Sequence, residues 1–293
     1  MGVVNARHPR YGALIGARVV WAPWVLAGYD RSSRRYPPRD RGRNDFARPA
    51  EIGRRSLDRT EVLEIDTQTS LAALMGSTPR HGEAMPRLRG VSHQIAFFIA
   101  VPLGVALAIS AHGAVARSAA IVFAASVAAM FGVSGLFHRI AWTPRARRWL
   151  GRLDHTMIYA LIAGTYTPVG LLAIQPGWRA PILGTVWGGA LIAVLTKLTW
   201  RGAPAWVTPA TCVALGWIAV IVFPQIVGRI GIAGALLLLG GGLAYTTGAL
   251  IYARQRPDPI PSTFGYHELF HALVIVAVIC QYATVAFFVL PRA

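Results

Sequence analysis

The pentapeptide HELFH, at residues 267–271, opens the last long apolar run of the chain. Its two histidines are four residues apart, so a helix would present both imidazoles on one face. Such a pair offers two nitrogen ligands to one metal ion, and a tetrahedral zinc site needs one or two more. The spacing therefore predicts part of a zinc site at His267 and His271.

Two earlier segments carry side chains that could complete this site. SGLFH, at the end of one apolar run, places Ser134 and His138 four residues apart, and RLDH places Asp154 at the start of the next run. His138 can be the third ligand, and Asp154 lies at a helix end that would bring it to the same membrane depth. His155 is left out of the ligand set, because it points about 100° away from Asp154 around the helix.

The glutamate of HELFH allows two interpretations. The pentapeptide matches H-E-x-x-H, in which the histidines bind zinc and the glutamate activates the attacking water of a metalloprotease. Zincins usually take a third ligand downstream, but no His, Asp or Glu follows His271, so a protease would have to draw that ligand from elsewhere in the chain. Alternatively, Glu268 caps the first helical turn, where the helix dipole favours a negative charge.

Composition indicates what kind of elements must position these residues. Of 293 residues, 54% are hydrophobic and 14% charged, and the mean hydropathy is +0.47, a balance typical of a polytopic membrane protein. Residues 1–91 hold 9 of the 12 acidic residues, which leaves Asp154, Asp258 and Glu268 in the rest of the chain. Ionisable groups at membrane depth are costly and usually face a partner or a metal in the bundle interior.

Seven apolar stretches follow the N-terminal region, each long enough to cross a hydrocarbon core about 30 Å thick. The predicted fold class is therefore all-α, a polytopic membrane protein built as a seven-transmembrane helix bundle. The predicted spans are 92–111, 118–138, 154–174, 180–198, 206–223, 231–253 and 267–290. On this topology His138, Asp154 and the HELFH histidines share one membrane depth, whereas His93 and His112 are expected to lie at the membrane interfaces.

The distribution of basic residues predicts the orientation. Outside the N-terminal tail, the loops on its side carry nine Lys and Arg residues and the opposite loops carry four, so we expect a cytoplasmic N-terminus. Residues 1–85, rich in Arg and Pro without helical or strand periodicity, are expected to be a disordered basic N-terminal extension to the membrane domain, 86–293. The net charge of +17 fits membrane topology and anionic headgroups, and no nucleic-acid-binding module is recognisable.

Several segments resemble the hemolysin III branch of the progestin and adipoQ receptor family, which includes the adiponectin receptors. They are PRLRGVSHQIAFF, SGLFH, RLDHTMIYALIAGTYTPV and HELFHALVIVAVICQY, within residues 86–289. The resemblance implies a seven-helix bundle with zinc held by His138, His267 and His271 near the cytoplasmic face. It also implies that Ser134 and Asp154 contact the zinc-bound water. The long N-terminal extension departs from the short basic lead typical of bacterial members.

Three classes of function follow from these observations. The first is a zinc-dependent, ceramidase-like hydrolase of a membrane lipid amide or ester, with Asp154 transferring the proton and Ser134 holding the water or the oxyanion. The second is a membrane homeostasis or sensor protein, and the third a pore-forming cytolysin, each with a structural zinc site. We expect a multi-pass protein of the inner (plasma) membrane with membrane lipids as partners, and the sequence identifies no protein partner.

Overall fold

The computed structural model describes residues 86–200, 202–204 and 206–293, so the predicted disordered extension lies outside the described residues. Within them the chain is helical and forms no strand. The helices are α2 (Val91–Ser110), α3 (Ala114–Arg139), α4 (Pro144–Leu172), α5 (Pro176–Thr199), α6 (Val207–Gly216), α7 (Phe223–Arg254) and α8 (Tyr266–Thr284), with the short helices η1 (Trp217–Val222), η2 (Val285–Val289) and η3 (Leu290–Arg292).

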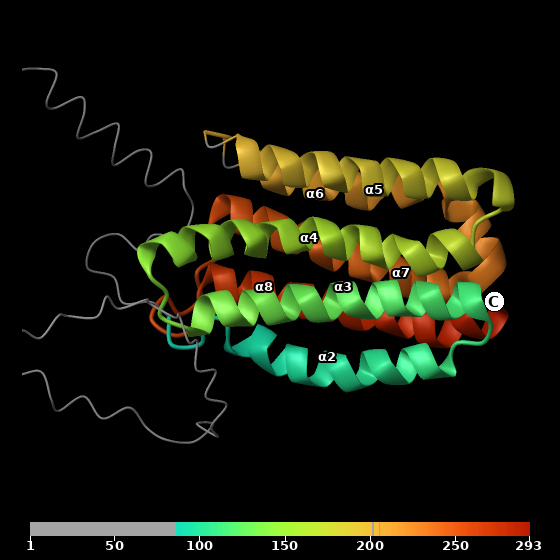
Figure 1. The fold of residues 1–293 in the computed structure, drawn as a ribbon, viewed down its shortest axis with the longest axis horizontal. Helices are drawn as coiled ribbons and strands as arrows, with labels where there is room; N and C mark the ends of the chain where they lie inside the picture. The colour runs from blue at the N-terminus through green and yellow to red at the C-terminus, as the bar shows by residue number, and fades with distance from the viewer. Residues whose placement is uncertain (1–85, 201, 205) are drawn as a thin grey trace, which may run out of the picture. The chain divides into compact units, whose positions relative to one another are not determined.

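The long helices run alternately in opposite directions, joined by short connections at the two ends of the bundle (Figure 1). α3 packs between α2 and α4, and α8 packs against α7 and also contacts α2. The α3–α4 and α7–α8 connections lie at the same end of the bundle, and the C-terminus lies at the other end (Figure 1). This arrangement brings the last turn of α3 and the first turn of α8 to one end.

Five helical stretches among the described residues are long and apolar enough to cross a membrane. One of them, Val207–Arg254, contains 48 residues, about 72 Å of helix, which is more than twice the thickness of a hydrocarbon core. Gly231, with φ 79° and ψ 169°, interrupts the helix near the middle of this stretch. The prediction of an all-helical, multi-pass membrane protein is confirmed, and the number of crossings stays a prediction.

Helix α4 begins ten residues before the predicted start of its span at 154. The Thr143 hydroxyl accepts a hydrogen bond from the Ala146 amide at 3.3 Å, and Pro144 occupies the first turn, where a missing N–H costs nothing. The basic segment that follows is therefore helical. The apolar run marks the part of the helix that suits lipid, whereas capping residues decide where the helix begins.

Small residues allow α3 and α4 to approach closely. A Cβ added to Gly164 of α4 would lie 2.0 Å from the Ser126 hydroxyl oxygen of α3, so only glycine fits at this crossing. Large apolar side chains fill the space beside it, among them Phe123 and Met130 of α3 and Leu161 of α4. This packing fixes the relative position of the two helices that carry His138 and Asp154.

Candidate metal centre

Three histidines meet at the end of the bundle where α3 ends and α8 begins. One ligand nitrogen from each of His138, His267 and His271 lies within 4.8 Å of the other two, and the Nε2 atoms of His138 and His267 are 3.2 Å apart. The three side chains are buried, with at most 4% of the surface of each exposed. The structure thus brings together the three histidines that the sequence predicts as ligands.

The chemistry of this cluster fits a metal ion. Two nitrogens bound to one tetrahedral zinc at about 2.0–2.1 Å would be separated by about 3.4 Å, close to the distance between the two Nε2 atoms. The Nδ1 atom of His271 is buried and has no hydrogen-bond partner in the described structure. Unpaired buried nitrogens are costly, and binding a cation is one way to offset that cost. These three histidines, which we call the triad, could therefore hold a metal ion.

The two polar residues predicted beside the ion lie next to the triad. An Asp154 carboxylate oxygen, Oδ2, lies 3.8 Å from His138 Nε2. Ser134 is buried one helical turn before His138, and Ser134 and Asp154 line the same cavity. A carboxylate and a hydroxyl therefore adjoin the three imidazoles.

His93, which the sequence predicted as an interfacial residue, is buried inside this site. His93 is 2% exposed, and its Nδ1 lies 2.9 Å from the Ser134 hydroxyl oxygen. Its ring stacks on that of His271, with the ring centroids 3.7 Å apart and an angle of 7° between the ring planes. The first turn of α2 packs against α3 and α8, which turns this residue inward. The segment PRLRGVSHQIAFF contains His93, and that was the available signal. His112, in contrast, is exposed.

Glu268 acts as a cap of α8. The side chain is 2% exposed, and its Oε2 accepts a hydrogen bond from the Gly265 amide at 2.9 Å. Its Oε1 accepts one from Arg89 Nε at 2.5 Å, in an ion pair that the sequence did not predict. Because both carboxylate oxygens are engaged, the geometry favours the capping role over that of a general base. Asp258 adds a second cap, since its Oδ1 accepts a hydrogen bond from the Tyr266 amide at 2.7 Å.

The segment before α2 closes over the triad. The amides of Arg87 and Leu88 donate hydrogen bonds to the carbonyl oxygens of Ser262 and Thr263, each at 3.2 Å. Gly90 then adopts a φ of +77°, and a Cβ there would lie 2.4 Å from His138 Cβ. Only glycine combines this backbone conformation with so close an approach. The lead-in to α2 is thus part of the wall around the three histidines.

His155 lies nearby with both ring nitrogens engaged. Its Nδ1 lies 2.7 Å from the Gly151 carbonyl oxygen, and its Nε2 lies 3.1 Å from the Tyr252 hydroxyl. Neither nitrogen is thus left over for a metal ion. This agrees with the prediction that His155 is not a ligand.

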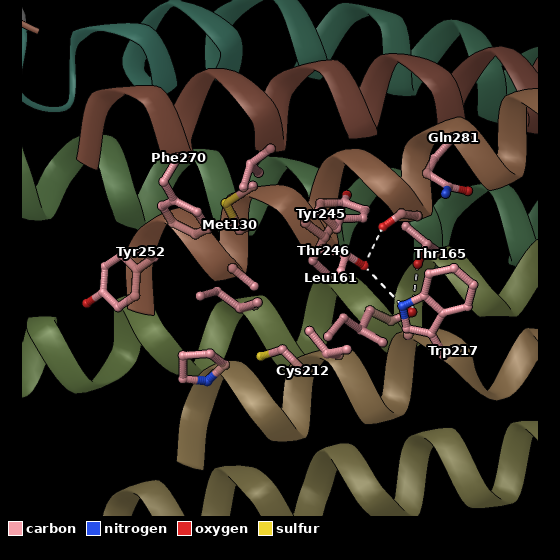
Figure 2. Close-up of a pocket in the computed structure, with 18 of the residues that line it drawn as sticks. Met130, Leu161, Thr165, Cys212, Trp217, Tyr245, Thr246, Tyr252, Phe270 and Gln281 are labelled. Atoms are coloured by element: carbon pink, nitrogen blue, oxygen red, sulfur yellow. Dashed lines mark hydrogen bonds between the residues drawn. The ribbon is translucent and has the colours of Figure 1, made fainter. Parts of the chain in front are cut away.

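A cavity extends from the triad into the bundle, with an empty volume of about 1560 Å³ including space open to the outside. Its lining includes His271 and, ten residues along α8, Gln281, so it follows that helix for about 15 Å. Figure 2 shows the cavity from Tyr252 at one side to Trp217 and Gln281 at the other, with Met130 and Leu161 among the apolar side chains between them. The cavity therefore joins a polar site to a long apolar chamber.

Comparison with known proteins gives one family. Residues 83–282 match the family model described as "Haemolysin-III related". The chain is 27% identical over 208 residues to "Hemolysin-3" of Bacillus cereus, covering 69% of this chain and 91% of that protein. It is also 27% identical over 167 residues to "Hemolysin-3 homolog" of Bacillus subtilis (strain 168), covering 57% of this chain and 75% of that one. The wider relationship to the adiponectin receptors stays a prediction.

Proposed function

Because the chain belongs to the hemolysin III family, a family of multi-pass membrane proteins, we propose that it is a zinc-dependent hydrolase acting on an amide or ester bond of a membrane lipid. The observation that carries this proposal is the position of the site. Three buried histidines and a carboxylate lie together at the end of a long apolar cavity. This combination suits a substrate with a polar scissile group and an apolar chain.

Zinc is the proposed metal, because three imidazole nitrogens beside one carboxylate suit it well. His138, His267 and His271 would hold the ion. When bound there, zinc supplies Lewis-acid activation of a water molecule and of a substrate carbonyl. The fixed imidazole positions provide the ligands, while the remaining chemistry depends on the side chains around them.

Asp154 and Ser134 are the proposed catalytic residues. Asp154 takes a proton from the attacking water and returns it to the leaving group, since its carboxylate is the acidic group that adjoins the triad. Ser134 orients the water or stabilises the developing oxyanion with its hydroxyl. The contact between His93 Nδ1 and the Ser134 oxygen fixes the position of that hydroxyl. The apolar chain of the lipid extends into the cavity along α8, which excludes water from it.

The proposed placement in the membrane has seven crossings. α4 provides one crossing beyond the five stretches of suitable length and composition, and the break at Gly231 divides Val207–Arg254 into two. The proposed N-terminus is cytoplasmic, because the end of the bundle that carries the site also carries most of the loop arginines. The membrane domain would comprise residues 86–293, in the inner (plasma) membrane, with the site near its cytoplasmic face.

Two measurements on purified protein test this function in order. Metal analysis should find about one zinc per wild-type chain and a large loss in the His267→Ala/His271→Ala variant. Asp154→Ala should then retain zinc but release no fatty acid from a panel of N-acyl and ester lipids that the wild type cleaves. Unchanged turnover in Asp154→Ala would refute the catalytic role of Asp154, and no cleavage by the zinc-loaded wild type would remove the hydrolase proposal while leaving the metal site in place.

Membrane lysis is a second candidate, favoured by the printed names of the relatives, "Hemolysin-3" and "Hemolysin-3 homolog". A pore predicts dye leakage from protein-free liposomes that rises with protein concentration, with or without zinc. A sensor or homeostasis protein instead predicts that His138→Ala lowers zinc content and thermal stability with no lipid cleavage to lose. The leakage and cleavage assays thus separate the three functions.

A further inference from the structure

A second groove lies between α5 and α6, at the end of the bundle that carries the metal centre. Its empty volume is about 630 Å³ including space open to the outside. Tyr159 of α4 contributes to its lining, Lys197 and Thr196 come from the last turns of α5, and Thr208 and Thr211 come from the first turns of α6. We call it the Lys197 groove. None of its lining residues belongs to the metal centre.

Lys197 has no carboxylate partner in the described part of the chain. Its ammonium donates a hydrogen bond to the Thr208 hydroxyl at 3.4 Å, and neither of the described ion pairs includes it. The described acids are engaged elsewhere: Asp154 beside His138, Glu268 with Arg89, and Asp258 with the Tyr266 amide. A cation on a membrane helix is therefore left without an anion of its own.

A second positive charge increases this imbalance. The electrostatics of Lys197 include a repulsion from Arg152 of α4, whose guanidinium itself lies over the Trp149 ring, 5.1 Å from the ring centroid. Two like charges on neighbouring helices repel each other, and the repulsion is greater where water is partly excluded. An anion between or beside them would remove this cost. The Lys197 groove thus combines one ammonium with the Thr208 hydroxyl, while Arg152 lies outside its lining.

The surroundings of the groove identify the source of that anion. Ile192, which lines it, is 67% exposed and Leu195 is 51% exposed, so the outer side of α5 suits lipid chains. Trp200 and Trp206, in the connection to α6, are 52% and 66% exposed. Tryptophans of this kind gather at the level of lipid headgroups. Lys197 therefore lies where a headgroup phosphate and its acyl chains would meet the protein.

We propose that the Lys197 groove binds the phosphate of an anionic membrane phospholipid. The ammonium of Lys197 and the hydroxyl of Thr208 contact the phosphate oxygens, Arg152 adds attraction, and an acyl chain follows the exposed side of α5 past Ile192. A lysine that only anchored the helix would extend outward to water. Lys197 instead reaches across to α6, and basic pockets between membrane helices bind such headgroups. This inference goes beyond the proposed hydrolase and does not depend on it.

The test measures lipid binding to the full-length protein in a neutral detergent. Dioleoylphosphatidylglycerol is titrated while bound lipid is counted by native mass spectrometry and thermal stability is followed. Lys197→Gln should weaken binding about tenfold, as expected for the loss of one charge-assisted contact. Arg145→Gln, which removes an exposed charge outside the groove, should bind like the wild type. Equal affinity in wild type and Lys197→Gln would overturn the proposal.

Three additional measurements identify the ligand and distinguish weaker lipid binding from misfolding of a variant. Dioleoylphosphatidylcholine, which has no net charge, should bind more weakly than phosphatidylglycerol, and equal binding would contradict recognition of an anionic headgroup. Inorganic phosphate should not reproduce the thermal stabilisation; the same stabilisation by phosphate alone would assign the groove to a free anion and refute the lipid as its source. If Lys197→Gln does not fold, Thr208→Val removes only the hydroxyl and should still lower affinity.

Discussion

The Arg89–Glu268 ion pair provides a direct test of how the metal centre is built. The Glu268 side chain is 2% exposed and the Arg89 side chain 15% exposed, and the two residues are 179 positions apart in the chain. Arg89→Met would leave the carboxylate buried without its cation. Removing one partner of a buried pair costs about 3–5 kcal/mol, so we expect the unfolding free energy to fall by about 3 kcal/mol, because the small exposure of Arg89 moderates the loss.

The same change should reach the metal site. Glu268 directly follows His267 in the first turn of α8 and accepts a hydrogen bond from the Gly265 amide, so loss of its partner would loosen the helix start that orients the imidazoles. We expect weaker zinc binding, about tenfold, measured by competition with a chromogenic chelator. Unfolding by denaturant in detergent micelles, monitored by circular dichroism, measures the loss of stability.

A paired variant separates this explanation from others. In Arg89→Met/Glu268→Gln the buried charge is gone, so stability and zinc affinity should recover in large part relative to Arg89→Met. Glu268→Gln alone should retain turnover if Glu268 is a cap, whereas a general base would lose turnover at unchanged zinc content. Wild-type stability in Arg89→Met, or no recovery in the double variant, would refute the structural role assigned to the pair.

Three further predictions follow from named contacts. His138→Ala should remove most of the bound zinc and His155→Ala should retain it, as measured by metal analysis; equal zinc in both would show that His138 is not a ligand. Gly90→Ala would place a Cβ 2.4 Å from His138 Cβ at a residue with positive φ, so it should destabilise the protein by about 1–2 kcal/mol and lower zinc occupancy. A stable Gly90→Ala variant with full zinc occupancy would contradict this close packing. Gly164→Ala should lower the unfolding free energy by about 1–3 kcal/mol, because its Cβ meets the Ser126 hydroxyl. Gly164→Ala/Ser126→Gly should recover part of that free energy, and equal stability of the two variants would refute the steric explanation.

The triad was predictable from the sequence because its signals are local. The i, i+4 spacing of His267 and His271, and the position of His138 at the end of an apolar run, depend only on helix periodicity and span length. These features place all three residues at one end of an antiparallel bundle. The same reasoning brings Asp154 to that end, and the structure places all four together.

The rest of the site depends on contacts between distant segments. His93 was expected at the interface, because the residues around it in the sequence give no sign of a distant partner. Its stacking partner, His271, is on the last long helix. The pairing of Arg89 with Glu268 likewise depends on how the lead-in to α2 crosses the 260–264 loop. Hydropathy located the apolar part of α4 but missed its capped basic first turns, since Thr143 and not apolarity sets the start of the helix.

The distance along the chain between the proposed ligands has a consequence for biogenesis. His138 ends the second long helix described, whereas its partner His267 is 129 residues later, in the final long helix. A ribosome would have to deliver every intervening helix to the bilayer before the imidazoles could meet. Capture of the cation would therefore mark the end of membrane insertion, and chains stalled upstream of α8 would be recognisable by their inability to retain it.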